Sequence, residues 1–558
     1  MERIGGGERR VVYPRSEAGE SAATPRKEGL MSVVVPRARL IGLLTSFSLV
    51  AVAGASQPAT PTWVFLQPRA AQSDPAALDV ALRRAEDAAD ARMLERRRLR
   101  RTTPGLLDVR DLPLDERPRV AVAALARVRT ESRWLNALSV EATPEQVEAI
   151  RSLPGVREVR PVARGRRCAE AQVCEDAVPE DRSHHVPRDF YGRSSAQLAQ
   201  INLQAMHVRG YTGRGVVIGI LDTGFNRVHQ SFNNPARPLH VIAERDFINA
   251  DDQTGPEAGD PAGQHSHGTL ILGCISSYLP DQLVGGAYDA SVILCKTENV
   301  ASETPIEEDF YVAGIEFIEA RGGDVATSSL GYIDWYTRED LDGQTAVTTI
   351  AVNIAAENGL HCCTAAGNDG HDADPATASI IAPADGLRVI SCGAADSAGV
   401  IAGFSSDGPT ADGRLKPELL ARGVGTATVH PDTVDTYAGA SGTSLSTPLV
   451  AAAVACLVQA NPWWTVDQMR AALCSTASDA AAPDARFVRG YGMVDAFAAF
   501  QSTCPADFNQ DGGVDGLDVG AFFLAWEAAE VGADVNHDGG VDGGDVETFF
   551  VIWQAGGC

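Results

Sequence analysis

The sequence predicts an α/β fold, with a doubly wound and mainly parallel sheet over residues 198–502. The first observation is a set of short, nearly continuous apolar runs, at residues 215–221, 291–295, 359–365 and 387–392. Such runs are typical of strands buried on both faces of a parallel sheet. The second observation is that helical patterns alternate with these runs, for example at residues 310–320 and 348–357. This alternation supplies the crossover helices that parallel strands need.

A small α+β domain is predicted ahead of this sheet, at residues 119–162. Thr143 is expected to cap a helix, with Pro144 in its first turn and Gln146 completing a capping box. This helix should end near Pro154 and Gly155. Three strands are expected around it, at residues 120–128, 136–142 and 156–161.

The segment before this domain, residues 56–118, is rich in Ala, Arg, Pro and Asp. Its basic run at residues 96–101 is interpreted as a solvated face, because arginine is rarely buried without a partner. Residues 163–197, which follow the domain, are polar and are expected to form an exposed, cleavable linker.

An apolar run at residues 40–55 follows Arg37 and Arg39 and ends in small residues. Its length favours a signal peptide at residues 31–55, with a buried core helix as the alternative. We therefore expect Met31 to be the true start, residues 1–30 to be a gene-model extension, and the protein to be secreted. The sequence contains no other run of 18 apolar residues, so no membrane span is expected in the mature protein.

Composition excludes some classes of protein. The chain has 558 residues and a net charge of −26, which argues against a nucleic-acid partner. Among its eleven cysteines, two pairs are candidates for disulfides: Cys168 with Cys174, and Cys504 with Cys558. No CxxC pair with zinc-ligand spacing is present. The other cysteines are expected to be buried small hydrophobes: Cys274, Cys295, Cys362, Cys363, Cys392, Cys456 and Cys474.

Three motifs carry candidate catalytic residues. Asp222 closes the first predicted strand in a D-T-G triplet, and His267 lies in an H-S-H-G-T motif. Ser444 lies in a Gly/Ser-rich turn that leads into an Ala-rich helix. A serine at a helix N-terminus lies among free N–H groups, which can stabilise an oxyanion. Taken singly, each motif also fits a simpler role. The triplet at Asp222 could be a turn, the two histidines around Ser266 could be metal ligands, and Ser444 could cap a helix.

Together, and in the order Asp, His, Ser, these motifs resemble the subtilisin-like (subtilase) family of serine peptidases. Further segments resemble motifs of the same family, at residues 286–290, 329–331, 365–370, 404–409 and 490–496. The resemblance covers residues 205–500 and implies an endopeptidase that acts on proteins or peptides. A catalytically idle fold used for binding, and transfer of the acyl group to an amine instead of water, stay open as alternatives.

The resemblance also implies roles for particular residues. Ser444 would attack the scissile carbonyl, His267 would exchange the proton, and Asp222 would orient the imidazole. Asn368 would donate its side-chain amide to the oxyanion. An edge strand would pair with the extended substrate through Ser329, Leu330 and Gly331. Residues 136–161 resemble the inhibitor-type propeptide of this family, which implies a self-processing zymogen inhibited by its own propeptide.

The C-terminal residues 503–558 contain a repeat with a period of 27. Each copy places oxygen-bearing side chains at positions 1, 3, 5, 9 and 12 of a loop, as an EF-hand calcium loop does. An amphipathic helix is expected after each loop. We therefore predict two calcium ions, with the ligands Asp507, Asn509, Asp511, Asp515 and Asp518, and Asp534, Asn536, Asp538, Asp542 and Asp545.

The whole tail resembles a type I dockerin, a small all-α calcium-binding module. This resemblance implies a cohesin-type partner. Attachment, sorting and calcium-dependent folding stay open as other roles for the tail.

Overall fold

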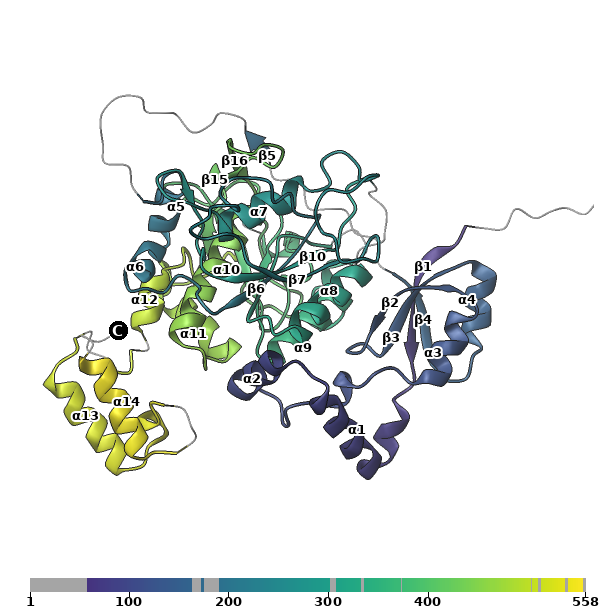
Figure 1. Cartoon of the computed structure of the whole chain (residues 1–558), viewed down its shortest axis with the longest axis horizontal. Coiled ribbons are helices and arrows are strands. Elements are labelled where there is room, and N and C mark those ends of the chain that lie inside the picture. The colour runs from purple at the N-terminus through teal and green to yellow at the C-terminus, as the bar shows by residue number, and fades with distance from the viewer. Residues whose placement is uncertain are drawn as a thin grey trace, which may run out of the picture. The chain divides into compact units, whose positions relative to one another are not determined.

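The computed structural model describes residues 58–162, 172–174, 190–301, 308–332, 336–372, 374–502, 504–509, 513–536 and 540–554. The expected signal peptide and the segment before it lie outside these ranges, as does most of the expected linker. The described part of residues 198–502 forms the predicted α/β domain (Figure 1).

The central sheet has seven strands, and all of its paired strands are parallel. Their order is β14-β13-β12-β11-β6-β10-β7. The four predicted strands are present as β6, β10, β12 and β13, so the predicted α/β fold with a parallel sheet is confirmed for this domain. The bounds are β6 (Val217–Asp222), β7 (Val241–Asp246), β10 (Ser291–Lys296), β11 (Val325–Ser328), β12 (His361–Ala365), β13 (Ile390–Ala395) and β14 (Leu419–Arg422).

Helices cover both faces of this sheet. On β6, Ile218 and Ile220 pack with α7 (Ser266–Ser276) and α10 (Thr443–Ala460). Val217 and Leu221 point to the other face, against α8 (Glu308–Ala320) and α9 (Val347–Glu357). Because successive side chains of a strand alternate between faces, an apolar run with no polar interruption buries both.

Helix α10 is the core helix of the domain. It is also long and apolar enough to cross a membrane, with a mean hydropathy of 1.5. However, 89% of it is buried inside the protein, so its apolar character is explained by packing. The seven cysteines expected to be buried hydrophobes are free thiols, and all but Cys474 are buried. Cys504 is in a disulfide, whose other cysteine lies outside the described side chains.

The N-terminal domain is a four-stranded antiparallel sheet in the order β2-β3-β1-β4. The capping box at Thr143 and Gln146 is confirmed. Two expectations were wrong: the sheet contains an additional strand, β1, and a helix, α3, occupies much of the expected strand at residues 120–128. The bounds are β1 (Thr60–Leu66), α3 (Glu116–Ala123), β2 (Arg127–Ser132), β3 (Ala137–Ala142), α4 (Pro144–Arg151) and β4 (Val156–Pro161).

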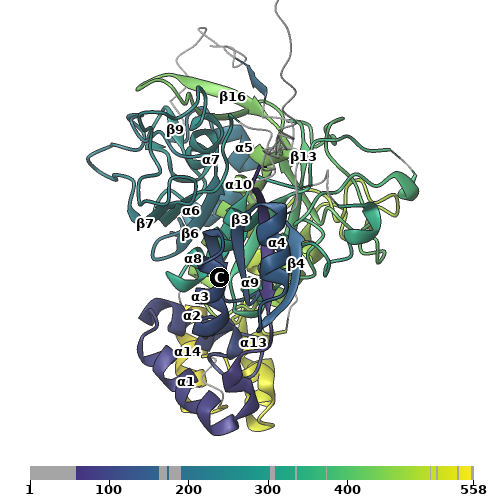
Figure 2. The same cartoon turned by 90° about the vertical axis from the view of Figure 1, so that its right-hand side faces the viewer.

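Both faces of this sheet are covered, and its central strands β1 and β3 are mostly buried. Helices α3 and α4 cover one face (Figures 1 and 2), where Val122 and Ile150 pack on Val64 and Leu138. Side chains of the other face, such as Trp63, belong to the same apolar cluster as α8 and α9. The N-terminal domain is therefore docked on the face of the α/β domain that these two helices form.

A helical segment is inserted between β1 and β2, and we call residues 74–111 the arm. It contains α1 (Pro75–Asp87) and α2 (Ala91–Arg100). The interpretation of residues 96–101 as a solvated face was wrong, because Arg96, Arg97 and Arg100 are buried. These side chains find carboxylates and carbonyl oxygens far away in the sequence, which no local pattern indicates.

The C-terminal tail contains two helices, α13 (Gly516–Glu527) and α14 (Gly543–Gln554). Phe522 and Phe549, which occupy equivalent positions of the repeat, are stacked with ring centroids 4.2 Å apart. The remaining elements are η1 (Ala70–Ser73), η2 (Val109–Asp111), β5 (Gln172–Cys174), α5 (Ser195–Gln200), α6 (Leu203–Val208), β8 (Tyr278–Leu279), β9 (Leu283–Val284), η3 (Arg338–Asp340), η4 (Pro375–Thr377), β15 (Thr426–Val429), β16 (Tyr437–Ser441), α11 (Val466–Thr476), α12 (Ala496–Gln501) and η5 (Val531–Ala533).

Candidate active site

The candidate catalytic residues come from three elements that meet at one edge of the central sheet. Asp222 is the last residue of β6, His267 is in the first turn of α7, and Ser444 is in the first turn of α10. In the sheet, Leu221 pairs with Ser328, so Ser329 follows at the same edge as Asp222. The carboxyl ends of parallel strands are where α/β proteins build their sites.

Asp222 and His267 form a hydrogen-bonded pair. The Nδ1 of His267 lies 2.8 Å and 3.0 Å from the two carboxylate oxygens of Asp222, which is fully buried. The backbone N–H of Thr223 donates to the same carboxylate at 2.7 Å. An ionised carboxylate only accepts, so Nδ1 carries the proton and Nε2 is the nitrogen that can take one.

Ser444 lies beside the end of β11. Its hydroxyl donates to the carbonyl oxygen of Ser329 at 3.2 Å, and the hydroxyl of Ser329 donates to the carbonyl oxygen of Ser444 at 2.9 Å. These reciprocal bonds connect the start of α10 to the segment after β11. They place the serine at a helix N-terminus, where backbone N–H groups and the helix dipole favour negative charge.

Asn368 is held by Thr443, the residue before the candidate nucleophile. The side-chain oxygen of Asn368 accepts from the backbone N–H of Thr443 at 2.8 Å and from its hydroxyl at 2.9 Å. The hydroxyl of Thr443 also lies 3.1 Å from the carbonyl oxygen of Gly367. These bonds fix the amide plane, with the nitrogen on the side away from Thr443. Thr443 was not singled out in the sequence, although its place beside Ser444 was a usable signal.

Ser329, Leu330 and Gly331 form the segment that is expected to pair with the substrate. They follow β11, an interior strand between β6 and β12, and extend beyond the sheet. Leu330 is buried, and a Cβ on Gly331 would lie 2.0 Å from the side chain of Ile381. Tyr332 exchanges backbone hydrogen bonds with Ala382 just beyond. The residue that follows this segment therefore has its own backbone partner beyond the edge where the candidate catalytic residues lie.

A second charged cluster lies near this edge. The carboxylates of Asp246, Asp251 and Glu257 come within 4.8 Å of one another, a grouping that could hold a cation. The ammonium group of Lys296 lies 2.9 Å from Asp246 and 3.0 Å from Asp260. Burial lowers the pKa of Lys296, but hydrogen bonds with these two carboxylates raise it further, so the net shift is upward. The ammonium group of Lys296 therefore places a positive charge among these carboxylates.

In the tail, the two repeats use the same hydrogen bonds. Asp518 is fully buried and accepts from the backbone N–H groups of Asn509 at 3.1 Å and Asp515 at 2.8 Å. Asp545 accepts in the same way from Asn536 at 3.0 Å and Asp542 at 2.8 Å. Asp507 and Asp534 begin the two loops, while Asp511 and Asp538 lie outside the described residues.

The tryptophans Trp526 and Trp553 connect the two repeats of the tail. The indole of Trp526 donates to the carbonyl oxygen of Asp542, and that of Trp553 donates to the carbonyl oxygen of Asp515. Each therefore contacts the loop of the other repeat. Buried carboxylates in oxygen-rich loops are the donor set that calcium prefers, so the described residues fit this ion.

An Asp–His pair and a serine at a helix N-terminus, on a parallel α/β sheet, are groups that serine hydrolases use. Residues 213–493 match the family model described as "Subtilase family", and residues 62–173 match "Peptidase S8 propeptide domain, Bacteroidota". The chain therefore belongs to the subtilase family. It is a subtilisin-like serine endopeptidase that carries a propeptide.

Individual relatives agree with this assignment. Subtilisin E from Bacillus subtilis (strain 168) is 28% identical over 376 residues, which is 67% of this chain and 83% of the relative. Subtilisin from Bacillus pumilus is 30% identical over 304 residues, which is 54% of this chain and 98% of the relative. The solved structure of fervidolysin from Fervidobacterium pennivorans, a keratinolytic enzyme related to subtilisin, shares the fold. Its TM-score is 0.55 at 20% identity, with 80% of this chain and 62% of that chain covered.

Proposed function

We propose that the protein is a secreted endopeptidase precursor that hydrolyses peptide bonds through Asp222, His267, Ser444 and Asn368. The observation that carries this proposal is the hydrogen bond from the Nδ1 of His267 to the buried Asp222, 2.8 Å long, at the edge where Ser444 begins α10. The proposed organisation of the chain is an extension at residues 1–30, a signal peptide at 31–55, a propeptide at 56–162, a linker at 163–197, the peptidase at 198–502 and the tail at 503–558.

In the proposed mechanism, the hydroxyl of Ser444 attacks the carbonyl carbon and passes its proton to the Nε2 of His267. Asp222 stabilises the imidazolium that results. The side-chain amide of Asn368 and the backbone N–H of Ser444 donate to the oxyanion. His267 then protonates the leaving amine, and water releases the acyl group. The segment Ser329–Leu330–Gly331 is proposed to position the extended substrate backbone.

The propeptide is proposed to inhibit the peptidase while it is docked. Contacts with the first turns of α8 support this: the indole of Trp63 donates to Glu308 at 3.1 Å, and Arg129 donates to Asp309 at 2.8 Å. Farther along α8, Ser132 donates to Glu316. The propeptide thus satisfies three carboxylates of a helix that also packs on β6, the strand that ends at Asp222.

Calcium is proposed as the ion of the tail, in two sites. The tail is proposed to be a dockerin-like module whose partner is of the cohesin type. The similarity of the two loops, each closed by a buried aspartate that accepts two backbone N–H groups, supports this proposal. The ion would supply positive charge between carboxylates that otherwise repel each other.

The test of the catalytic proposal is the intact mass of the protein expressed from Met31 in calcium. The wild type should lose the segment ahead of a cut within residues 163–197, and Ser444→Ala should retain it. Ser446→Ala is the matched control, because Ser446 is equally buried in the same turn and donates to the carbonyl oxygen of Thr443. If the wild type also stays uncut and cleaves no peptide, the protein is a catalytically idle member of its family.

A further inference from the structure

The arm docks at the edge of the central sheet opposite the candidate catalytic residues. Arg100 donates to Asp324 at 3.0 Å, and Asp324 directly precedes β11. The same carboxylate accepts from the backbone N–H of Val217, the first residue of β6. In parallel strands all amino ends share one edge, whereas Asp222 closes the carboxyl end of β6. Six residues of strand, about 20 Å, separate the two edges.

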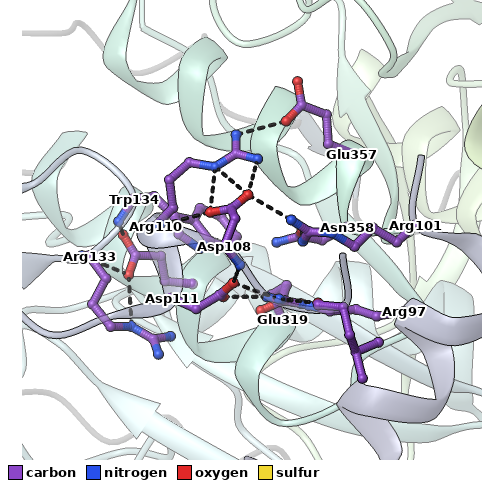
Figure 3. Close-up of polar contacts among 12 residues, drawn as sticks. Arg97, Arg101, Asp108, Arg110, Asp111, Arg133, Trp134, Glu319, Glu357 and Asn358 are labelled. Carbon is purple, nitrogen blue, oxygen red and sulfur yellow. Dashed lines mark hydrogen bonds and ion pairs between the residues drawn. The ribbon is translucent and has the colours of Figure 1, made fainter. Parts of the chain in front are cut away.

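The docking surface is built to bind guanidinium groups. Arg96 and Arg97 share the carboxylate of Glu319, the residue before the end of α8. Within the arm itself, Arg97 also donates to both carboxylate oxygens of Asp111, at 2.7 Å and 2.9 Å (Figure 3). Arg96 and Glu319 are almost fully buried. A guanidinium presents five donors in a planar fork, so a surface that binds it must supply several acceptors.

Backbone carbonyl oxygens supply the further acceptors. Arg96 donates to the carbonyl oxygens of Glu319 at 3.1 Å and Gly323 at 2.6 Å. Arg100 donates to that of Pro462 at 2.6 Å, and Arg92 to that of Gly322 at 3.0 Å. Burial raises the pKa of Glu319, but Arg96 and Arg97 lower it by more, so the carboxylate stays ionised. The surface therefore combines charge with fixed dipoles.

The shape of this surface also fits the arm. A Cβ on Gly322 would lie 2.8 Å from the Cβ of Arg92, and one on Gly359 would lie 2.5 Å from the Cβ of Arg100. Both glycines have positive φ, of 76° and 84°, which L side chains rarely adopt. At these two positions the peptidase backbone comes close to the backbone of α2, and any side chain would separate them.

We infer that this guanidinium-binding surface is a second anchoring site, whose occupant is the arm of the chain's own propeptide. It holds the propeptide on the peptidase after the linker is cut, without contacting the candidate catalytic residues. The propeptide is then bivalent, with its sheet on α8 and α9 and its arm at the opposite edge of the central sheet. While one contact holds, the other rebinds at a high effective concentration, so release requires both to open.

The inference depends on the propeptide assignment but not on catalysis by Ser444, so it is tested in a chain that cannot cut itself. A recognition sequence for an unrelated site-specific protease is placed in the linker of the Ser444→Ala chain. After cleavage in trans, the rate at which the propeptide leaves is measured by dilution and native mass spectrometry. Failure of the catalytic proposal would leave this measurement unchanged.

Arg96→Gln and Arg100→Gln should each speed the departure of the propeptide by tenfold or more, an estimate from the cost of breaking a buried ion pair. Both changes leave the peptidase sequence intact. Arg98→Ala, on the exposed side of the same helix, is the matched control and should leave the rate unchanged. Equal rates for all four chains would overturn the inference.

A folding defect is distinguished by hydrogen exchange in the uncut chains. In Arg96→Gln and Arg100→Gln, the amides of α2 should lose protection while those of β1 and β3 keep it. Loss of protection throughout the propeptide, including its sheet, would show that the arginines only support folding, and would equally overturn the inference of a separate anchor.

Discussion

At the scale of single residues, the site depends on neighbouring residues that hold the candidate catalytic side chains in place. Thr223 and Thr443 each lie directly after or before a candidate catalytic residue, and each fixes the orientation of a partner through a short hydrogen bond. Asp222, His267 and Ser444 could be predicted from sequence because their three motifs occur together in the order Asp, His, Ser, although each motif alone also fits a simpler role. The orienting role of Thr443 could not, because it depends on where Asn368 lies in space.

Thr443→Val tests this orienting role. The substitution keeps the shape of the side chain but removes the hydroxyl that donates to Asn368. We expect kcat to fall by about tenfold with little change in KM, because a mispositioned oxyanion donor is felt mainly in the transition state. Steady-state kinetics on a peptide substrate measure this.

Thr447→Val is the control for that experiment, since Thr447 is also buried in α10, one turn later. A similar loss in both variants would mean that the effect comes from the packing of α10. The substitution Asn368→Ala should lower kcat by a factor on the order of 10²–10³, the range known for removal of an oxyanion donor in subtilisin.

At the scale of elements, continuous apolar runs predicted four of the seven strands of the central sheet, β6, β10, β12 and β13, because these strands are buried on both faces. Apolar periodicity failed at residues 120–128, where alternating Val and Ala fit a strand and a helix equally well, and the helix α3 forms. It also missed β1, which lies in a segment whose composition resembles a linker. The arm could not be foreseen, because Arg96 finds Glu319 at a separation of 223 residues.

The tail gives a prediction at this scale. Chelation of calcium should unfold α13 and α14, since the buried Asp518 and Asp545 would face other carboxylates without a cation. Asp518→Asn should lower the number of bound calcium ions from two to one. Calorimetric titration of the full chain measures the number, and circular dichroism follows the helices.

The matched control is Asp467→Asn, an exposed aspartate on α11 outside the tail, which should leave the number of ions unchanged. Helical content that is the same with and without chelator would contradict the calcium-dependent folding of the tail. A number of ions unchanged in Asp518→Asn would contradict its role as a ligand.

At the scale of the whole molecule, the propeptide and the peptidase meet through buried carboxylates on α8. Burial raises the pKa of Glu308 from 4.5 to about 7, against the opposing effect of hydrogen bonds from Tyr336 and Trp63. Arg160 also lowers this pKa, and Asp309 raises it. Burial likewise raises the pKa of Glu316.

Release of the propeptide should therefore accelerate as the pH rises from 5 to 7. Below pH 4.5, Glu308 is protonated whether docked or released, so docking has its full strength. Between 4.5 and about 7, the released form loses its proton and the docked form keeps it, so docking weakens. Above that range both forms are ionised, and the rate should level off.

The measurement is the departure of the propeptide from the cut Ser444→Ala chain at several pH values. Glu308→Gln, which cannot ionise, should flatten most of the dependence. Glu339→Gln is the control, because Glu339 belongs to the 3-10 helix η3 and is not buried. A slope equally steep in Glu308→Gln would assign the dependence to another group.

Helix α10 has a consequence for how activation can be observed. Its first turn contains Ser444, and two residues beyond its last turn Pro462 accepts the hydrogen bond from Arg100. Eighteen residues of helix, about 27 Å, lie between these ends. Trp463 and Trp464 follow Pro462 directly. The protein therefore carries two tryptophans next to the site from which the arm is released. Their fluorescence can report the rate at which the arm leaves, while substrate turnover reports the chemistry at Ser444, at the other end of the helix.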